Sequence, residues 1–150
     1  MKQITQFRRQ FFFLSNMYPC KVKYDGLVFN SAEHAYQYAK AVTPEDKQYV
    51  LDAEDPFDSK KRGRKVRKRA DWDDVKLSIM INVVWNKFAM NDDCREALML
   101  TKGYDLIEDN WWDDTYWGIC DGKGENYLGR ILMHLRETLE YFDEKDIKIK

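Results

Sequence analysis

The sequence has few of the residues that hold together a disulfide-linked, zinc-bound or membrane-spanning protein. Its three cysteines, Cys20, Cys94 and Cys120, are odd in number and lack the C-x-x-C spacing of a zinc site, so we expect reduced and mostly structural thiols. No apolar run approaches the roughly 20 residues needed to cross a bilayer. The apolar residues 11–14 are also too few for the core of a signal peptide, so we expect a cytoplasmic protein without a membrane partner.

The chain also lacks a large net charge. Charged residues make up 34% of its 150 residues, yet the formal net charge is −1, which argues against a general nucleic-acid binder that relies on overall positive charge. A chain of this length is typical of one domain with its own hydrophobic core. We therefore predict a single domain over residues 1–150, with a charged and frayed tail at residues 143–150.

Common catalytic signatures are missing as well. The sequence has no Walker loop, no G-x-G-x-x-G fingerprint, no H-E-x-x-H helix and no convincing set of serine, histidine and aspartate. His134 falls off the apolar face of the last predicted helix, so we expect it at the surface without a chemical role. Hydrolysis by carboxylates is the chemistry for which candidates remain, and we expect neither a metal nor a cofactor.

Turn and cap residues divide the chain into a hairpin followed by helices. The alternation in residues 20–24, the turn Asp25-Gly26 and residues 27–29 predict a β-hairpin. Helices are predicted after Ser31, after Thr43-Pro44, after Asp55-Pro56, over 72–88, over 93–100 and after Asn126, with a short strand at 104–107. The last helix carries an apolar stripe of Leu128, Ile131, Leu132, Leu135, Leu139 and Phe142.

The helix after Ser31 carries the most informative pattern of polar residues. Glu33, Gln37 and Lys40 follow one another at helical spacing, so a carboxylate, an amide and an ammonium share one face near the beginning of the helix. Spacing alone favours the simpler alternative, an ordinary capped helix with a solvated polar face. The buried side of that helix would then consist of Ala32, Ala35, Tyr36, Ala39 and Val42.

A dense basic run is the second notable feature. From Lys60 to Arg69, eight of ten residues are lysine or arginine, interrupted only by Gly63 and Val66. Such a run attracts phosphate groups, either those of a nucleotide at the mouth of a pocket or those of a nucleic-acid backbone. A solvated helix face, offset by the acidic residues 105–114, explains the run equally well.

Acidic, aromatic and glycine residues gather before the last helix. Asp113, Asp114, Tyr116 and Trp117 set carboxylates beside aromatic rings, and the loop from Gly122 to Asn126 leads directly into the helix. Backbone N–H groups of such a loop can bind an anion, and an aromatic ring can stack on a base. A plain turn followed by an asparagine cap gives the same pattern.

Several short motifs follow one another in a specific order. They are Phe13-Leu-Ser-Asn16, Ser31-Ala-Glu-His-Ala-Tyr-Gln37 with Lys40, Gly63-Arg64, Trp72, Tyr116-Trp-Gly118, and Gly124-Glu-Asn-Tyr-Leu-Gly129 with Leu132-Met133 and Arg136. Their order and spacing, from about residue 11 to residue 139, resemble the NADAR superfamily, which includes YbiA-like N-glycosidases. This resemblance covers nearly the whole chain.

The resemblance implies a compact, mainly α-helical α+β fold with a small hairpin or sheet near the N-terminus. It also implies hydrolysis of N-glycosidic bonds, since family members act on phosphoribosylamino-pyrimidine intermediates of riboflavin synthesis or remove ADP-ribose from guanine in nucleic acid. Matching positions put Glu33, Lys40 and Asp114 in catalytic roles. The implied ligand-binding residues are Asn16, Gln37, Arg64, Trp117, Gly118 and Asn126.

Cleavage of an N-glycosidic bond develops positive charge at the anomeric carbon, so we expect Glu33 to stabilise that charge or to activate water, with Lys40 orienting it. Asp114 would bind ribose or act as a second carboxylate. The segment 108–114 departs from the family pattern, so Glu108, Asp109 and Asp113 are alternatives for that role. Arg64 and the loop from Gly122 to Asn126 would bind phosphate, and Trp117 would pack on sugar or base.

We expect the substrate to be an ADP-ribose-like or phosphoribosyl compound, and the first choice is ADP-ribose on guanine in nucleic acid or nucleotides. The basic run from Lys60 to Arg69 favours this choice over a free riboflavin precursor. A non-catalytic sensor of ADP-ribose or a related nucleotide is the alternative from another class, and a structural or protein-interaction role is the third. The physiological substrate and the oligomeric state are left open.

Overall fold

The computed structural model describes residues 2–149, which form two units. The central unit is Asn16–Asn91, and the terminal unit consists of residues 2–15 and 92–149. Each unit buries apolar side chains of its own, such as Val50 and Val83 in the central unit and Leu106 and Leu132 in the terminal unit. The single domain over residues 1–150 stays a prediction.

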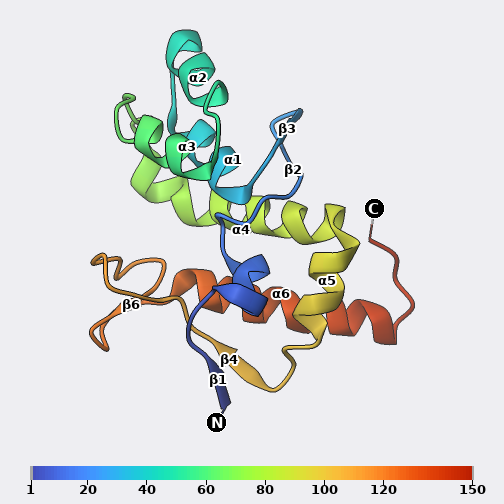
Figure 1. The fold of residues 1–150 in the computed structure, drawn as a ribbon. Helices are drawn as coiled ribbons and strands as arrows, with labels where there is room; N and C mark the ends of the chain where they lie inside the picture. Colours follow the sequence, from blue (N-terminus) through green and yellow to red (C-terminus); the bar gives the residue numbers. More distant parts are fainter. Residues whose placement is uncertain (1, 150) are drawn as a thin grey trace. The chain divides into compact units, whose positions relative to one another are not determined.

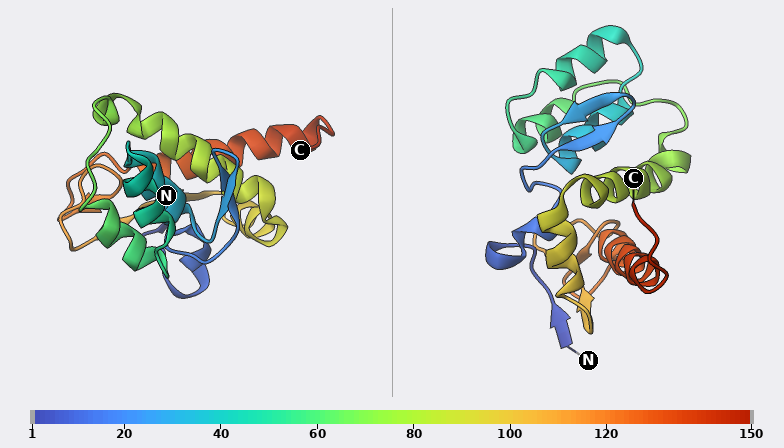
Figure 2. Two further views of the ribbon diagram at one scale, coloured as in Figure 1. Left: turned by 90° about the horizontal axis from the view of Figure 1, so that it is seen from above. Right: turned by 90° about the vertical axis from the view of Figure 1, so that its right-hand side faces the viewer.

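The central unit begins with the predicted hairpin. Strands β2 (Val22–Tyr24) and β3 (Leu27–Phe29) pair antiparallel, with Val22 opposite Phe29, and both of these side chains are buried. Asp25 and Gly26 both have positive φ, 52° and 76°, which a tight two-residue hairpin turn requires. Figure 2 shows the hairpin beside the helices of the central unit, and it packs against α1 and α4.

Four helices complete the central unit (Figure 1): α1 (Ala32–Lys40), α2 (Pro44–Leu51), α3 (Pro56–Gly63) and α4 (Trp72–Met90). Helix α1 packs against the other three, so seven of its nine residues are buried. It ends at Lys40 because Ala41 takes up an extended conformation and bridges to Lys68. Val42 therefore lies beyond the helix and is 49% exposed, which corrects the prediction that it belongs to the buried side.

Local caps explain where α2 and α3 begin. The Thr43 hydroxyl accepts a hydrogen bond from the N–H of Asp46, and the Asp55 carboxylate accepts one from the N–H of Asp58. A proline follows each cap at the first helical position, as predicted. Asp71 precedes α4 without capping it, because its carboxylate accepts two hydrogen bonds from Arg69 instead.

The terminal unit combines two helices, a 3₁₀ helix and two pairs of short parallel strands. These elements are β1 (Lys2–Ile4) with β4 (Tyr104–Leu106), β5 (Asp109–Asn110) with β6 (Ile119–Cys120), η1 (Arg9–Leu14), α5 (Asp92–Met99) and α6 (Tyr127–Glu144). Helix α6 packs on β4 and α5. Of its predicted stripe, Leu128, Leu132, Leu135 and Leu139 are buried, whereas Ile131 and Phe142 are only half-buried.

The α+β prediction is confirmed, since six α-helices and six short strands occur within residues 2–149. None of the three cysteines forms a disulfide within residues 2–149, and His134 is exposed, as expected. Among the described helices, none combines the length and the apolar character that spanning a membrane requires.

Candidate functional site

Helix α1 is held at its beginning by two groups from the preceding chain. The Ser31 hydroxyl accepts a hydrogen bond of 3.0 Å from the N–H of His34, which caps the helix. The N–H of Glu33 donates to the carbonyl of Asn16 at 2.9 Å. The backbone that carries Glu33 is therefore fixed from both sides.

The polar face of α1 is buried rather than solvated. Glu33 is 8% exposed and Gln37 is 3% exposed, and the Gln37 Nε2 donates to Glu33 Oε1 at 2.7 Å. The simpler alternative of an ordinary solvated face is wrong for these two residues. A carboxylate held in this way has a defined orientation, because the amide of the next turn fixes one of its oxygens.

Gln37 is in turn fixed by a glycine of α3. A Cβ atom added to Gly63 would lie 1.9 Å from Gln37 Oε1, so only glycine lets the two helices approach this closely. Gln37 Oε1 is buried and accepts no hydrogen bond from any described residue. A buried acceptor without a donor is costly and is typical of functional positions rather than of ordinary cores.

Lys40 extends the same face into an aromatic environment. Its Nζ lies 5.7 Å from the ring centre of Tyr36 and 5.8 Å from that of Trp72. Burial lowers the pKa of Lys40, the Glu33 carboxylate opposes this by raising it, and Lys68, Arg64 and Lys60 lower it further by repulsion. Glu33 and three cations of the basic run therefore act on one ammonium group.

Asn16 and Arg64 complete the predicted residues of the central unit. Asn16 is buried, and its Nδ2 lies 3.4 Å from the sulfur of Met80, while its carbonyl accepts from Glu33 as described. Arg64 is the exposed residue after α3 and lies close enough to Lys40 to influence its pKa. Asn16 therefore helps to position Glu33, whereas Arg64 is available to a ligand.

In the terminal unit, the predicted site residue Asp114 forms hydrogen bonds with the main chain of its own turn. The Asp114 Oδ1 accepts hydrogen bonds from the N–H groups of Tyr116 and Trp117, at 3.1 Å and 2.9 Å. Asn110 holds the main chain of Asp114 from the other side through both of its side-chain atoms. One oxygen of the Asp114 carboxylate thus stabilises the turn that carries Trp117.

Asn126 and Gly118 pack against the main chain near β4 and β5. The Asn126 Oδ1 accepts from the N–H of Glu108 and its Nδ2 donates to the carbonyl of Leu106, both at 3.0 Å. A Cβ atom at Gly118 would lie 2.2 Å from the Glu108 carbonyl oxygen. These contacts give both residues a structural role, and their predicted role in ligand binding stays a prediction.

Backbone carbonyls already pair with the N–H groups at the start of α6. The N–H groups of Glu125, Asn126, Tyr127 and Leu128 donate to carbonyls of residues 115–118, at 2.8–3.2 Å. An anion cannot accept hydrogen bonds from donors that already have backbone partners. The N–H groups of these four residues are therefore already bonded within the protein, and binding of phosphate by the loop from Gly122 to Asn126 stays a prediction.

Burial does not show which of the four acidic residues in segment 108–114 is the second carboxylate of the predicted site. Glu108 and Asp114 are half-buried, whereas Asp109 and Asp113 are exposed, and Asp113 has a positive φ of 70°. All four residues stay alternatives for the second carboxylate.

The aromatic rings beside Lys40 were not predicted from the sequence. The spacing could have indicated one of them, because Tyr36 lies four positions before Lys40, the separation at which side chains of a helix meet.

Fold and site together define a small α+β protein whose first helix presents a buried carboxylate and amide beside a partly buried lysine. The chain belongs to the NADAR family, because the family model described as NADAR domain matches residues 4–140. It is 32% identical over 128 residues to the N-glycosidase YbiA of Escherichia coli, with 83% of this chain and 79% of that protein covered. The NMR structure of Escherichia coli YbiA superposes with a TM-score of 0.83 at 29% identity, covering 95% of this chain and 89% of that chain.

Two further relatives are an N-glycosidase and a riboflavin biosynthesis protein. An N-glycosidase of Nostoc punctiforme is 34% identical over 131 residues, which cover 83% of each protein. A riboflavin biosynthesis protein of Vibrio vulnificus is 37% identical over 131 residues, which are 85% of this chain but only 35% of that protein. The chain thus spans about a third of the Vibrio protein. It is also similar to proteins named as N-glycosidases, which are hydrolases that act on N-glycosyl bonds.

Proposed function

We propose that the chain is an N-glycosidase that hydrolyses the C1–N bond of ADP-ribose-type adducts, with ADP-ribose on guanine in nucleic acid or nucleotides as its first substrate. The observation that carries the proposal is the buried pair of Glu33 and Gln37 on the helix face that also holds Lys40. The names of the N-glycosidase relatives support the reaction class.

The chemistry follows from the two oxygens of Glu33. Gln37 donates to Oε1, whereas Oε2 accepts no hydrogen bond from the described residues. Loss of the base leaves positive charge on the ribose ring, which an oriented carboxylate stabilises directly or relieves by activating a water molecule. Oε2 of Glu33 would perform this step while Oε1 keeps the side chain in place.

Lys40 would orient Glu33 through its positive charge. The interaction between the two groups is supported by the rise that Glu33 causes in the pKa of Lys40. Arg64 would bind phosphate of the substrate. Asp114 as ribose ligand or second carboxylate, Trp117 as the ring that packs on sugar or base, and Gly118 and Asn126 as ligand-binding residues stay predictions.

Replacement of Glu33 by glutamine tests the role of the carboxylate. Glu33→Gln keeps the shape of the side chain, and we expect hydrolysis to fall at least about 100-fold, the usual contribution of an acid–base group. Glu45→Gln, an exposed change on α2, is the matched control and should retain activity. Turnover by Glu33→Gln at the rate of the unaltered protein would remove Glu33 from the mechanism.

Two substrates assayed side by side decide the specificity. Chromatography of the products compares hydrolysis of ADP-ribosyl-guanine, the substrate proposed first, with hydrolysis of a phosphoribosylamino-pyrimidine. The name of the Vibrio vulnificus relative favours the pyrimidine, which is a riboflavin precursor. Hydrolysis of the pyrimidine substrate alone would overturn the first choice and leave the N-glycosidase class intact.

A thermal shift experiment separates an enzyme from a non-catalytic sensor. ADP-ribose at 100 times its dissociation constant should stabilise the protein by about 2.7 kcal/mol. Binding of ADP-ribose without release of product from either substrate would support the sensor and contradict the proposed hydrolase.

A further inference from the structure

The basic run contains cations that have no acidic partner. Arg62 pairs with Asp58 and Arg69 pairs with Asp71, at 3.1 Å and 2.6 Å. Lys61, Lys65 and Arg67 are exposed, and none of them forms an ion pair with a carboxylate of residues 2–149. Three unpaired positive charges within seven residues repel one another, so they favour an external polyanion.

The backbone that carries these charges is anchored. Val66 is 8% exposed and packs with Ala41 and Val50, and Lys68 bridges to Ala41. The N–H of Arg69 donates to the carbonyl of Lys40 at 2.9 Å. The loop between Gly63 and Arg69 is thereby attached to the helix that carries Glu33, and the cations between its anchors are directed to solvent.

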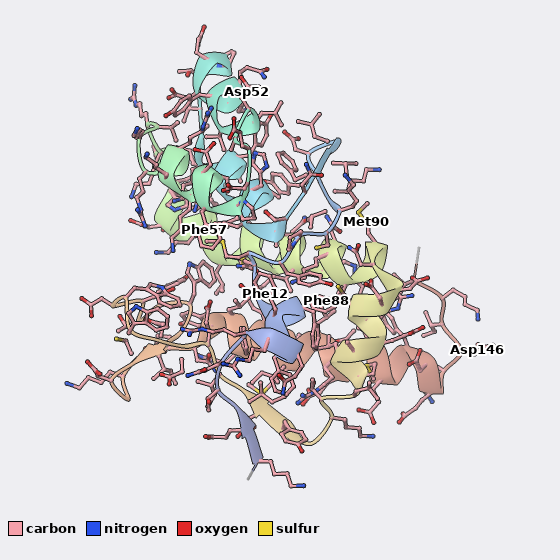
Figure 3. The ribbon with its side chains drawn as sticks, in the orientation of Figure 1. Phe12, Asp52, Phe57, Phe88, Met90 and Asp146 are labelled. Carbon is pink, nitrogen blue, oxygen red and sulfur yellow. The ribbon has the colours of Figure 1, made fainter. Side chains whose placement is uncertain are left out.

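An exposed aromatic ring lies on the same helix as the first of these cations. Phe57, which is labelled in Figure 3, belongs to α3 and is 68% exposed. Lys61 follows it one helical turn later, about 6 Å along the axis. On the neighbouring helix α2, Tyr49 is also partly exposed and has the Arg62 guanidinium 4.7 Å from its ring centre. Aromatic rings alternating with cations are typical of surfaces that bind single-stranded nucleic acid.

The charges around Phe57 favour a nucleic acid over an anionic membrane. Glu54 and Asp55 are exposed at the end of α3 where Phe57 lies, whereas Lys61 and Lys65 lie at the other end. A flat anionic bilayer would bring both ends against its headgroups. A nucleotide would place its uncharged base on Phe57 and its phosphates at the cationic end.

We propose that Phe57, Lys61, Lys65 and Arg67 form a single-strand surface, on which a base stacks against Phe57 and backbone phosphates bind the three cations. The proposal rests on the proposed function and specifies it, because the substrate is then an adduct within a single-stranded polynucleotide. A base in a duplex is stacked between its neighbours and offers no free face to Phe57.

Fluorescence anisotropy with an unmodified labelled single strand of about 16 nucleotides tests the surface without any turnover. In the triple variant Lys61→Gln, Lys65→Gln, Arg67→Gln we expect the slope of log affinity against log salt to become shallower by about 2, at about 0.7 per phosphate released. The control variant Lys21→Gln, Lys23→Gln, Lys145→Gln removes three exposed charges elsewhere. An equal change in the control would overturn the proposal, because overall charge would then explain the binding.

Phe57→Ala should weaken binding of the single strand by about 5- to 150-fold and leave the salt slope unchanged, since stacking on an aromatic ring contributes about 1–3 kcal/mol per base. Phe57→Trp should retain the affinity, which separates stacking from a loss of folding. Equal weakening of duplex binding by Phe57→Ala, or binding of phosphatidylserine vesicles instead of the single strand, would overturn the proposal.

Turnover distinguishes failure of this proposal from failure of the proposed function. We expect the triple variant to lose at least about tenfold in kcat/KM on an ADP-ribosylated single strand and to act normally on an ADP-ribosylated guanosine nucleotide. Unchanged kcat/KM on both substrates would refute the single-strand surface and leave the hydrolase intact. Binding that depends on Phe57 without hydrolysis by any variant would refute the hydrolase alone.

Discussion

Two helix beginnings in this chain use polar residues in opposite ways. At the start of α1, Ser31 and the Asn16 carbonyl satisfy the backbone, and the side chains of Glu33 and Gln37 each keep one oxygen without a donor among residues 2–149. At the start of α6, the Asn126 side chain and the carbonyls of 115–118 bond to the main chain itself. Both regions carry residues of family motifs, and in the first of them the buried acceptor Gln37 Oε1 finds no donor among residues 2–149.

This difference separates residues that hold a site from residues that perform chemistry. A polar group whose partners are all main-chain atoms stabilises a turn, and its loss leaves buried groups unsatisfied. A buried polar group without a partner reduces stability and is retained where it serves a ligand or a reaction. Mutations at the start of α6 should therefore reduce mainly stability, whereas mutations of Glu33 and Gln37 on α1 should reduce mainly activity.

Replacement of Asn126 should have the largest effect on stability. Asn126→Ala removes the hydrogen bonds to the Glu108 N–H and to the Leu106 carbonyl. Loss of a buried hydrogen bond costs about 1–3 kcal/mol, so we expect a loss of about 2–6 kcal/mol in urea denaturation. Glu125→Ala, an exposed neighbour, should change stability by less than about 0.5 kcal/mol. If Asn126→Ala instead keeps normal stability and loses binding of ADP-ribose, Asn126 is a ligand-binding residue. The difference between the beginnings of α1 and α6 would then not hold.

Replacement of Gln37 should separate activity from stability at the other helix. Gln37→Leu removes an acceptor that has no donor, but it also removes the donor to the buried Glu33 carboxylate, so the two effects oppose each other and the free energy of unfolding should change little. The turnover number kcat should fall by about 10- to 100-fold, because Glu33 loses the bond that orients it, while KM changes little. Gln48→Leu on α2 is the control, and a loss of stability in Gln37→Leu with normal kcat would place Gln37 among the purely structural residues.

The pH dependence of stability tests the environment of Lys40. Burial lowers the pKa of Lys40 below its ordinary 10.5, so the folded protein binds fewer protons than the unfolded chain between the lowered pKa and 10.5. The cost of burying the charge is therefore fully present below the lowered pKa and disappears as the pH rises toward 10.5. The free energy of unfolding of the unaltered protein, minus that of Lys40→Met, should increase over this range.

The same difference measured with Lys123→Met, an exposed lysine, should stay flat with pH. A flat difference for Lys40→Met as well would mean that Lys40 is solvated, and that its aromatic surroundings do not affect its charge.

The smallest effect is expected at the cap of α1. Ser31→Ala removes the hydrogen bond to His34 N–H and should reduce stability by about 1 kcal/mol in urea denaturation, the usual value of a helix cap. Ser78→Ala, which is exposed on α4, is the control. A loss as large as that of Asn126→Ala would show that both helix beginnings depend equally on one side chain.

Much of the local structure was predictable, because it depends on neighbours in the sequence. Caps at Ser31, Thr43 and Asp55, and the Asp25-Gly26 turn, act over three or four residues and were confirmed. The pairs β1–β4 and β5–β6 were missed, because the former joins residues about a hundred positions apart and the latter has strands of only two residues. Neither long-range pairing nor so short a strand leaves a periodic pattern.

The sequence by itself determined that Glu33, Gln37 and Lys40 share one face of a capped helix, since helical geometry and the cap are local properties. Only the tertiary structure decided that this face is buried, because Gly63 of α3 and Trp72 of α4 come against it from distant positions. The tertiary structure likewise decided that Asn126 bonds to the main chain at β4 and Glu108. The burial of a side chain and its hydrogen-bond partners depend on which helices and strands pack together in space. The spacing of residues along one helix contains no information about that packing.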